Sequence, residues 1–341
     1  MELFTILRTA VDAIAPIVLL IGLGYLLRKK GILTAEFVRV GGKLGFSLCL
    51  PCSLFINVYH IEGMEVIAWD MVIFSMVMVL VEFLIGIWAS GLATRDPRRR
   101  GVVLQCVFRS NVAIVGLPLA QALGGQAAAA ATSIIIAFTL PVLNIGAVTA
   151  LSLYVDGNGR KVDGRAIARK IARNPLIHGI LLGMLCLLLR SFQLRRFGSV
   201  VFSFERDLTV FYKCVNNLNR IASPFMLLIL GGEFDFSACR GMAREICHGV
   251  VWRTVLCPVL AIGSAFLLTR YTGLIQCTSV YYPGMIALFG SPTAVSGSVM
   301  AGQMGNDEQL ATQLVVFTSL ASVVTMFLTA CILMGAGLIV P

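Results

Sequence analysis

The chain predicts an all-α integral membrane protein with about ten transmembrane helices. It is 58% hydrophobic and 13% charged, with a mean hydropathy of +0.89, which is far more apolar surface than a soluble domain buries. At about 20 apolar residues for each span, 341 residues leave room for about ten spans and short loops. Despite the net charge of +10, the basic residues lie in short runs between apolar blocks, as topology signals do. We therefore expect a lipid bilayer, and no nucleic acid, as the surrounding partner.

Apolar blocks place five predicted spans in each half of the chain. Those of the first half lie at 9–27, 40–59, 70–93, 101–123 and 127–154. A polar, basic linker follows at 156–173. The spans of the second half lie at 175–189, 221–236, 246–269, 280–303 and 309–339. The mixed region 190–220 predicts an amphipathic helix at the membrane interface.

Basic residues orient these spans. The loops after the first, third and fifth spans carry Lys and Arg, whereas those after the second and fourth carry none. Because cytoplasmic loops hold the positive excess, the linker 156–173 should be cytoplasmic and both termini extracytoplasmic, in a plasma (inner) membrane. The basic residues within 190–220 contradict this topology, since they fall on its outer side.

The fourth span contains polar groups beside a proline. Arg109, Ser110 and Asn111 precede Gly116 and Pro118 within one apolar stretch. Proline removes a backbone donor and breaks a helix. In lipid, such a break persists only where it is buried in protein or lines a wet cavity. The stretch is therefore a candidate binding site, with the break predicted at Pro118.

The second half repeats the order of these features. Gly290-Ser291-Pro292 corresponds to Gly116-Leu117-Pro118, and Gly305-Asn306 corresponds to the glycine pair at 124–125. Because each half has an odd number of spans, two such repeats, 1–155 and 174–341, must have opposite orientation. Inverted repeats with matching broken spans are typical of secondary transporters, whose site lies between them at the midplane.

Two broken spans would present free backbone N–H groups and positive helix ends, which attract a carboxylate. Side chains of both spans could add hydrogen bonds. The predicted substrate-binding residues are Asn111, Gly116, Pro118, Ser291, Pro292, Thr293 and Ser296, with Leu50 from the second span. In the alternative interpretation the prolines only kink the helices and the small residues allow close packing.

Four ionisable residues lie within or beside spans, where charge is costly and often functional. Glu82 could be a protonatable coupling group or a neutral, hydrogen-bonded acid, and Arg253 could pair with an acid near the site. Asp70 begins the third span. Arg109 could face the substrate, or reach the interface with its long side chain. Coupling or support roles are predicted for Asp70, Glu82 and Arg253.

No motif predicts a cofactor, a metal site or catalysis. The chain has no phosphate-binding GxxxxGK[ST] loop and no Cys/His cluster with zinc spacing. Its three histidines have no partner arrangement that suggests an enzyme.

Several of these motifs resemble those of the auxin efflux carrier family of secondary transporters. They are Leu50-Pro51, Asn111 with Gly116-Leu117-Pro118-Leu119, Asn174-Pro175-Leu176, and Ser291-Pro292-Thr293-Ala294. The resemblance implies ten helices in two inverted repeats, like sodium/proton antiporters and bile-acid symporters, with helices 4 and 9 crossing at unwound prolines. Helices 1, 2, 6 and 7 would form a scaffold, often the contact of a homodimer, and helices 3–5 and 8–10 a moving transport part.

The resemblance also implies residue roles and a branch. Asn111 matches an asparagine near the substrate carboxylate in the plant carriers, and Asp70 matches an aspartate of their polar support site. Gly297 stands where the plant carriers have a second proline, and their long hydrophilic linker is absent. Both departures favour a bacterial carrier of malonate-like or malate-like acids over an auxin exporter.

The sequence thus predicts an elevator-type transporter, or a potential-driven exporter, of a small organic anion such as a mono- or dicarboxylate or an auxin-like weak acid. Two alternatives stay open, which are a sodium-coupled carboxylate symporter and a membrane ligand sensor that moves nothing.

Overall fold

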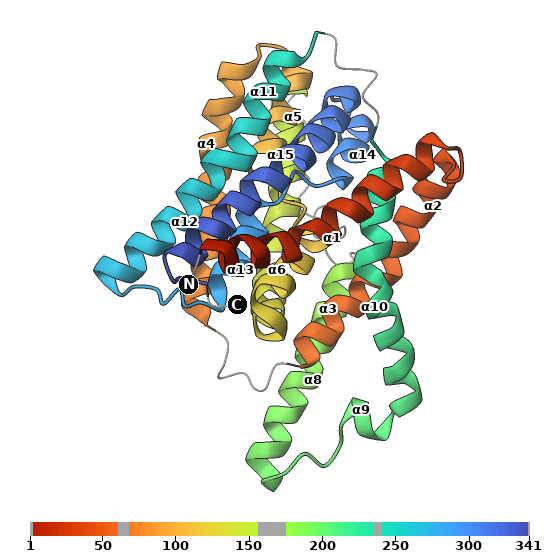
Figure 1. The fold of residues 1–341 in the computed structure, drawn as a ribbon, viewed down its shortest axis with the longest axis vertical. Coiled ribbons are helices and arrows are strands. Elements are labelled where there is room, and N and C mark those ends of the chain that lie inside the picture. Colours follow the sequence, from red (N-terminus) through yellow and green to blue (C-terminus); the bar gives the residue numbers. More distant parts are fainter. Residues whose placement is uncertain (1–2, 61–67, 156–174, 235–240, 340–341) are drawn as a thin grey trace.

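A computed structural model describes residues 3–60, 68–155, 175–234 and 241–339. The predicted linker 156–173 lies outside these residues, as does Asn174 of the motif Asn174-Pro175-Leu176. Every regular element in the described ranges is helical (Figure 1). Those of the first half are α1 (Leu3–Lys29), α2 (Ala35–Leu44), η1 (Gly45–Cys49), α3 (Leu50–Tyr59), α4 (Trp69–Ala93), α5 (Pro97–Phe108), η3 (Val112–Gly116) and α6 (Leu117–Val155).

The second half has the same helical character. Its elements are α8 (Pro175–Phe197), α9 (Phe204–Asp207), α10 (Thr209–Gly232), α11 (Ala243–Val251), η4 (Trp252–Leu256), α12 (Cys257–Leu267), η5 (Leu268–Thr272), α13 (Tyr281–Met285), η6 (Ile286–Gly290), α14 (Ser296–Gln303) and α15 (Glu308–Gly335). The elements named η are single π-helical turns within or at the ends of longer helices.

Among the described residues, 6 helical stretches are long and apolar enough to cross a membrane. They are Ala35–Tyr59, Trp69–Ala93, Val112–Tyr154, Pro175–Phe197, Ala243–Thr272 and Glu308–Gly335. The stretch Val112–Tyr154 has 43 residues, about 65 Å of helix, or twice the hydrocarbon thickness of a bilayer. Its backbone is interrupted at Gly124 and Gly125, where Gly125 has φ 64°. The predicted all-helical membrane protein is confirmed, and the ten-helix inverted arrangement stays a prediction.

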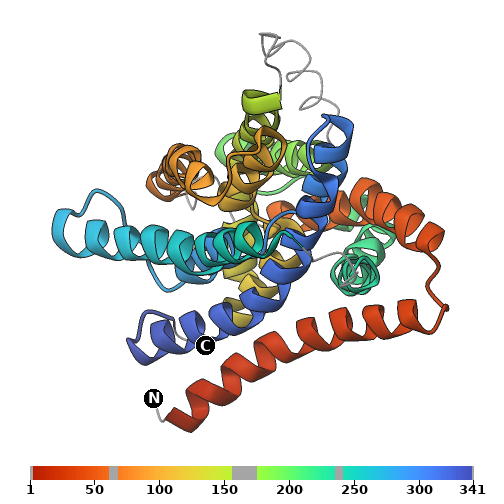
Figure 2. The same cartoon turned by 90° about the horizontal axis from the view of Figure 1, so that it is seen from above.

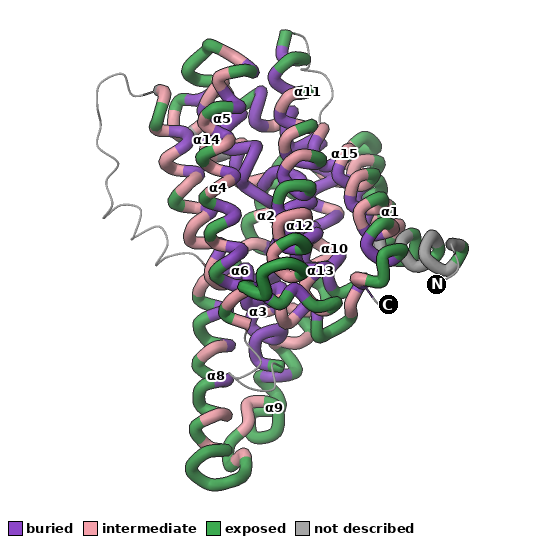
Figure 3. Tube along the Cα trace, turned by 90° about the vertical axis from the view of Figure 1, so that its left-hand side faces the viewer, coloured by how far each residue is buried: buried purple, intermediate pink, exposed green. Residues whose placement is uncertain are grey.

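The region 190–220 differs from its prediction. Instead of a separate interfacial helix, α8 continues to Phe197 and α10 begins at Thr209, with only the short α9 between them. Arg195 and Arg196 lie in the last turn of α8, where positive side chains stabilise the helix dipole rather than end the helix. The end of α8, α9 and the beginning of α10 extend beyond the rest of the molecule, and the end of α8 and α9 are largely exposed (Figures 1 and 3).

The helices pack in two groups. One consists of α1, α2, η1, α3, α8 and α10, and the other of α4, α5 and α6 together with α11–α15. α1 lies along α10, where a Cβ on Gly231 would collide with the carbonyl of Ile21. Seen from above, α4 and α5 lie beside α6, across the molecule from α1 (Figure 2).

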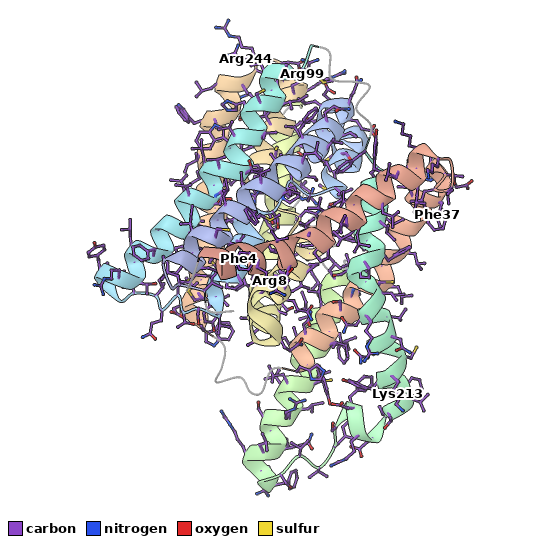
Figure 4. The ribbon with its side chains drawn as sticks, in the orientation of Figure 1. Phe4, Arg8, Phe37, Arg99, Lys213 and Arg244 are labelled. Atoms are coloured by element: carbon purple, nitrogen blue, oxygen red, sulfur yellow. The ribbon has the colours of Figure 1, made fainter. Side chains whose placement is uncertain are left out.

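The basic side chains mark opposite ends of this bundle. Arg99 of α5 and Arg244 of α11 lie at one end, and Lys213 of α10 lies towards the other (Figure 4). Arg99 joins three elements, because its guanidinium donates to Glu245 of α11 (3.2 Å) and to Asp307 ahead of α15 (3.0 Å). The second helix group is thereby held together at this end.

Candidate functional site

Two interrupted helices meet inside the second group. The first interruption, 109–111, separates α5 from η3, and the second, 291–295, separates η6 from α14. Ser110 and Thr293 form an antiparallel β-bridge. The Asn111 N–H donates to the Pro292 carbonyl (2.8 Å), and the Ala294 N–H donates to the Arg109 carbonyl (3.1 Å). Each break thus satisfies backbone groups of the other, as a break in lipid requires.

The position of the first break corrects one prediction. Pro292 lies in its break as expected, but Pro118 does not, because it is the second residue of α6. The π-helical turn η3 runs directly into α6 as one helical stretch, Val112–Tyr154, so the helix continues through Pro118 and is not broken there. Gly116 allows the half-helices to approach, since a Cβ there would lie 2.5 Å from the Ala287 carbonyl oxygen.

A cavity of about 420 Å³ opens beside the paired breaks. Its walls come from α2 and η1, from the first break and η3, from the later part of α6, and from α8, α10 and α14. The residues that line it are Arg39, Gly42, Lys43, Phe46, Ser47, Arg109, Ser110, Asn111, Val112, Ala113, Ile114, Leu140, Leu143, Asn144, Leu176, Met226, Glu233, Ala294, Val295, Ser296 and Met300.

The predicted site residues divide into two sets. Asn111 and Ser296 line this cavity. The predicted binding residues that do not line it are Leu50, Gly116, Pro118, Ser291, Pro292 and Thr293. Leu50 is 1% exposed in the apolar core, and Thr293 holds the break through a hydrogen bond from its hydroxyl to the Arg109 carbonyl (3.2 Å).

Arg109 is the residue whose place the sequence left open, and it lies in the cavity wall rather than at the interface. Its side chain is 5% exposed. The guanidinium donates to Ser296 Oγ (3.0 Å), Asn144 Oδ1 (3.3 Å) and Met300 Sδ (3.1 Å), which are all neutral. Among the described residues it forms no ion pair. A buried cation without a counter-ion is costly, so this guanidinium is suited to an anion that arrives from outside.

Two further polar groups of the same break are open. Asn111 Nδ2 and Ser110 Oγ are buried and have no hydrogen-bond partner in the described part of the chain. Buried donors normally have a partner, so these atoms are free to bind a ligand in the cavity that they line. With Arg109 they bring charged and neutral donors together at one wall.

Two further cations line the cavity. Arg39 and Lys43, both exposed, carry positive charge at the α2 side, and Glu233 is the only acid in the described lining. Clefts lined by one sign of charge concentrate ions of the opposite sign. The sequence alone assigns no site role to Arg39, Lys43 or Glu233.

The three predicted coupling residues lie away from the cavity lining. Asp70 Oδ2 accepts a hydrogen bond from the backbone N–H of Gln276 (2.7 Å), so it ties the start of α4 to the loop before α13. Glu82 of α4 and Arg253 of η4 form an ion pair (3.6 Å) with 1% and 0% of their side chains exposed. The described residues contain no group of three His, Cys, Asp or Glu that could hold a metal ion.

These features define a multi-pass helical membrane protein with an anion-attracting cavity at two paired helix breaks. Residues 9–163 and 164–330 match the family described as membrane transport protein, and the chain belongs to this family of auxin efflux carriers. It is a family of transporters and not of enzymes. No curated protein matches the chain.

Proposed function

We propose that this chain carries a small organic anion across the plasma membrane, and that Arg109 and Asn111 hold its carboxylate. The observation that carries the proposal is the buried Arg109 guanidinium, whose side-chain partners among the described residues are all neutral, near the Asn111 amide, which has no partner there. A guanidinium matches the planar geometry of a carboxylate and forms strong, charge-assisted hydrogen bonds with it.

The volume of the cavity supports a small acid. Ligand pockets typically measure about 300–1,000 Å³, and this one, at about 420 Å³, lies at the lower end. Its apolar walls, among them Leu140, Leu143 and Met226, suit the hydrocarbon body of a mono- or dicarboxylate or of an aromatic weak acid.

The transport cycle that we propose is of the elevator type, on two inverted five-helix halves, 1–155 and 174–341. One wall of the cavity comes from the paired breaks, α6 and α14, and the opposite wall from α2, η1, α8 and α10. Because these walls belong to different helix groups, sliding one group against the other would expose the ligand to either side. The first helix group, α1, α2, η1, α3, α8 and α10, would be the scaffold and the contact of a homodimer. Both termini would be extracytoplasmic.

The driving force in this proposal is the membrane potential. It contributes about 2.3 kcal/mol for each charge and 100 mV, which favours export of an anion from a cell with a negative interior. Proton coupling through Asp70 or Glu82 is the alternative, and it predicts that the rate falls when a pH gradient is dissipated at constant voltage.

Reconstitution into liposomes tests the function directly. Vesicles loaded with one unlabelled organic acid should accumulate the same labelled acid by counterflow, at constant voltage and pH, and empty vesicles should not. A panel of mono- and dicarboxylates identifies the substrate. Specific binding of an acid without any counterflow would refute transport and indicate a sensor.

A further inference from the structure

The Arg253 side chain lies outside the cavity lining. It comes from the π-helical turn η4 and is 0% exposed. All of its nitrogens donate to main-chain carbonyls. Nε donates to Ser291 (2.8 Å), Nη1 to Val107 (3.1 Å), and Nη2 to both Leu288 and Phe289 (2.8 Å each).

These four carbonyls share one property. Val107 lies in the last turn of α5, Leu288 and Phe289 in η6, and Ser291 directly after η6. They are therefore the carbonyl ends of the two half-helices that stop at the breaks. Such carbonyls have no partner within their own helix and carry the negative end of the helix dipole.

Converging carbonyls at the ends of broken helices form the sites in which secondary transporters bind sodium. In this chain a guanidinium fills that place from within, at distances of normal hydrogen bonds. Glu82 of α4 lies on another side of the same guanidinium, with Arg253 Nη1 and Glu82 Oε2 3.6 Å apart. One fixed positive charge thus faces a carboxylate and two negative helix ends.

We infer that Arg253 is a built-in cation that replaces a bound sodium ion at the paired helix ends, so that this carrier works without sodium. Arg253 is a positioning residue. It holds the ends of α5 and η6 in place, and through them the break that presents Arg109 and Asn111 to the cavity. The part of this inference that concerns transport rests on the proposed function. The part that concerns the cation site does not depend on transport, because melting temperatures can test it.

The wild-type protein gives the first test. Counterflow should be the same within twofold when sodium chloride is replaced by choline chloride at equal ionic strength. The melting temperature of the purified protein should also be the same in both salts. A loss of more than twofold in choline, or a melting temperature raised by sodium, would overturn the inference.

Chemical rescue gives the second test. The variant Arg253→Ala should lose at least tenfold in counterflow, and millimolar guanidinium should restore a substantial part of the rate and raise the melting temperature of the variant. Arg270→Ala is the matched control, because it removes an exposed guanidinium from the same stretch, Ala243–Thr272. It should behave like the wild type and should not respond to guanidinium.

The remaining outcomes are decisive as well. A folded Arg253→Ala protein that keeps the wild-type rate, or that guanidinium neither reactivates nor stabilises, contradicts a cation site. If the variant does not fold, the sodium comparison on the wild type decides. If no acid shows counterflow, the proposed function fails, and the melting temperatures still test whether sodium binds.

Discussion

Replacing Arg109 with glutamine should weaken substrate binding and, unusually for a buried residue, should not lower the stability of the empty carrier. Glutamine retains a donor that can reach Ser296 or Asn144, which are the neutral partners of the guanidinium. The substitution removes the positive charge of Arg109, a residue that is 5% exposed and has no counter-ion among the described residues. Such a charge is costly to bury until an anion binds.

The magnitude follows from the environment of the guanidinium. Two unit charges 4 Å apart interact with about 4 kcal/mol at an effective dielectric constant of 20. Part of this offsets the desolvation of the carboxylate, so the net value should approach that of a hydrogen bond to a charged group, about 1.5–3 kcal/mol. At about 1.4 kcal/mol for each factor of ten, half-saturation should rise roughly ten- to hundredfold.

Counterflow measured over a range of substrate concentrations gives half-saturation and maximal rate separately. The expected result for Arg109→Gln is a large increase in half-saturation, with a melting temperature in detergent at or above that of the wild type. A half-saturation within twofold of the wild-type value would refute the assignment of Arg109. A lower melting temperature of the empty protein would refute the argument that the charge is unpaired.

Three further substitutions test other parts of the site. Asn111→Ala removes an amide nitrogen that has no partner in the described part of the chain. It should therefore cost about 1.5–3 kcal/mol of substrate binding in the same assay and leave the melting temperature unchanged; normal transport at low substrate would show that the amide does not bind the substrate. Gly116→Val places a Cβ 2.5 Å from the Ala287 carbonyl oxygen, so it should reduce the yield of folded protein in gel filtration. A normal yield would contradict the close approach of the backbone at Gly116 to that of Ala287. Pro118→Ala changes a residue outside the cavity lining, where η3 passes into α6, so counterflow should stay within about twofold of wild type by the small size of such changes; a large loss would show that the proline itself is needed for transport.

Much of the fold could be predicted, because a chain in lipid has to satisfy its backbone within helices. The third span, predicted at 70–93, is α4 (Trp69–Ala93), and the last, predicted at 309–339, is α15 (Glu308–Gly335). The glycine turns were also predictable, and Gly305 adopts φ 75° between α14 and α15. In each case a local property, hydrophobicity or conformational freedom, determines the element.

The details of the site depend on contacts that the sequence does not reveal. A proline can break a helix or follow a π-helical turn inside one, and nothing near Pro118 in the sequence distinguishes the two. An arginine near the end of a span can reach water or turn inward. For Arg109 the choice depends on Asn144 and Ser296, which are far away in the chain. Its position two residues before Asn111 is a signal in the sequence that ranks Arg109 with that residue.

The β-bridge between Ser110 and Thr293 has a consequence for the synthesis of the protein. Among the described residues, the Asn111 N–H and the Arg109 carbonyl receive their partners from Pro292, Thr293 and Ala294, about 180 residues later, which at typical translation speeds is roughly 10–40 s. Until then the nascent first half holds unsatisfied polar backbone at membrane depth. The early chain should therefore be a substrate for membrane insertases and quality-control proteases, and the two halves should not form a stable protein when either is expressed alone.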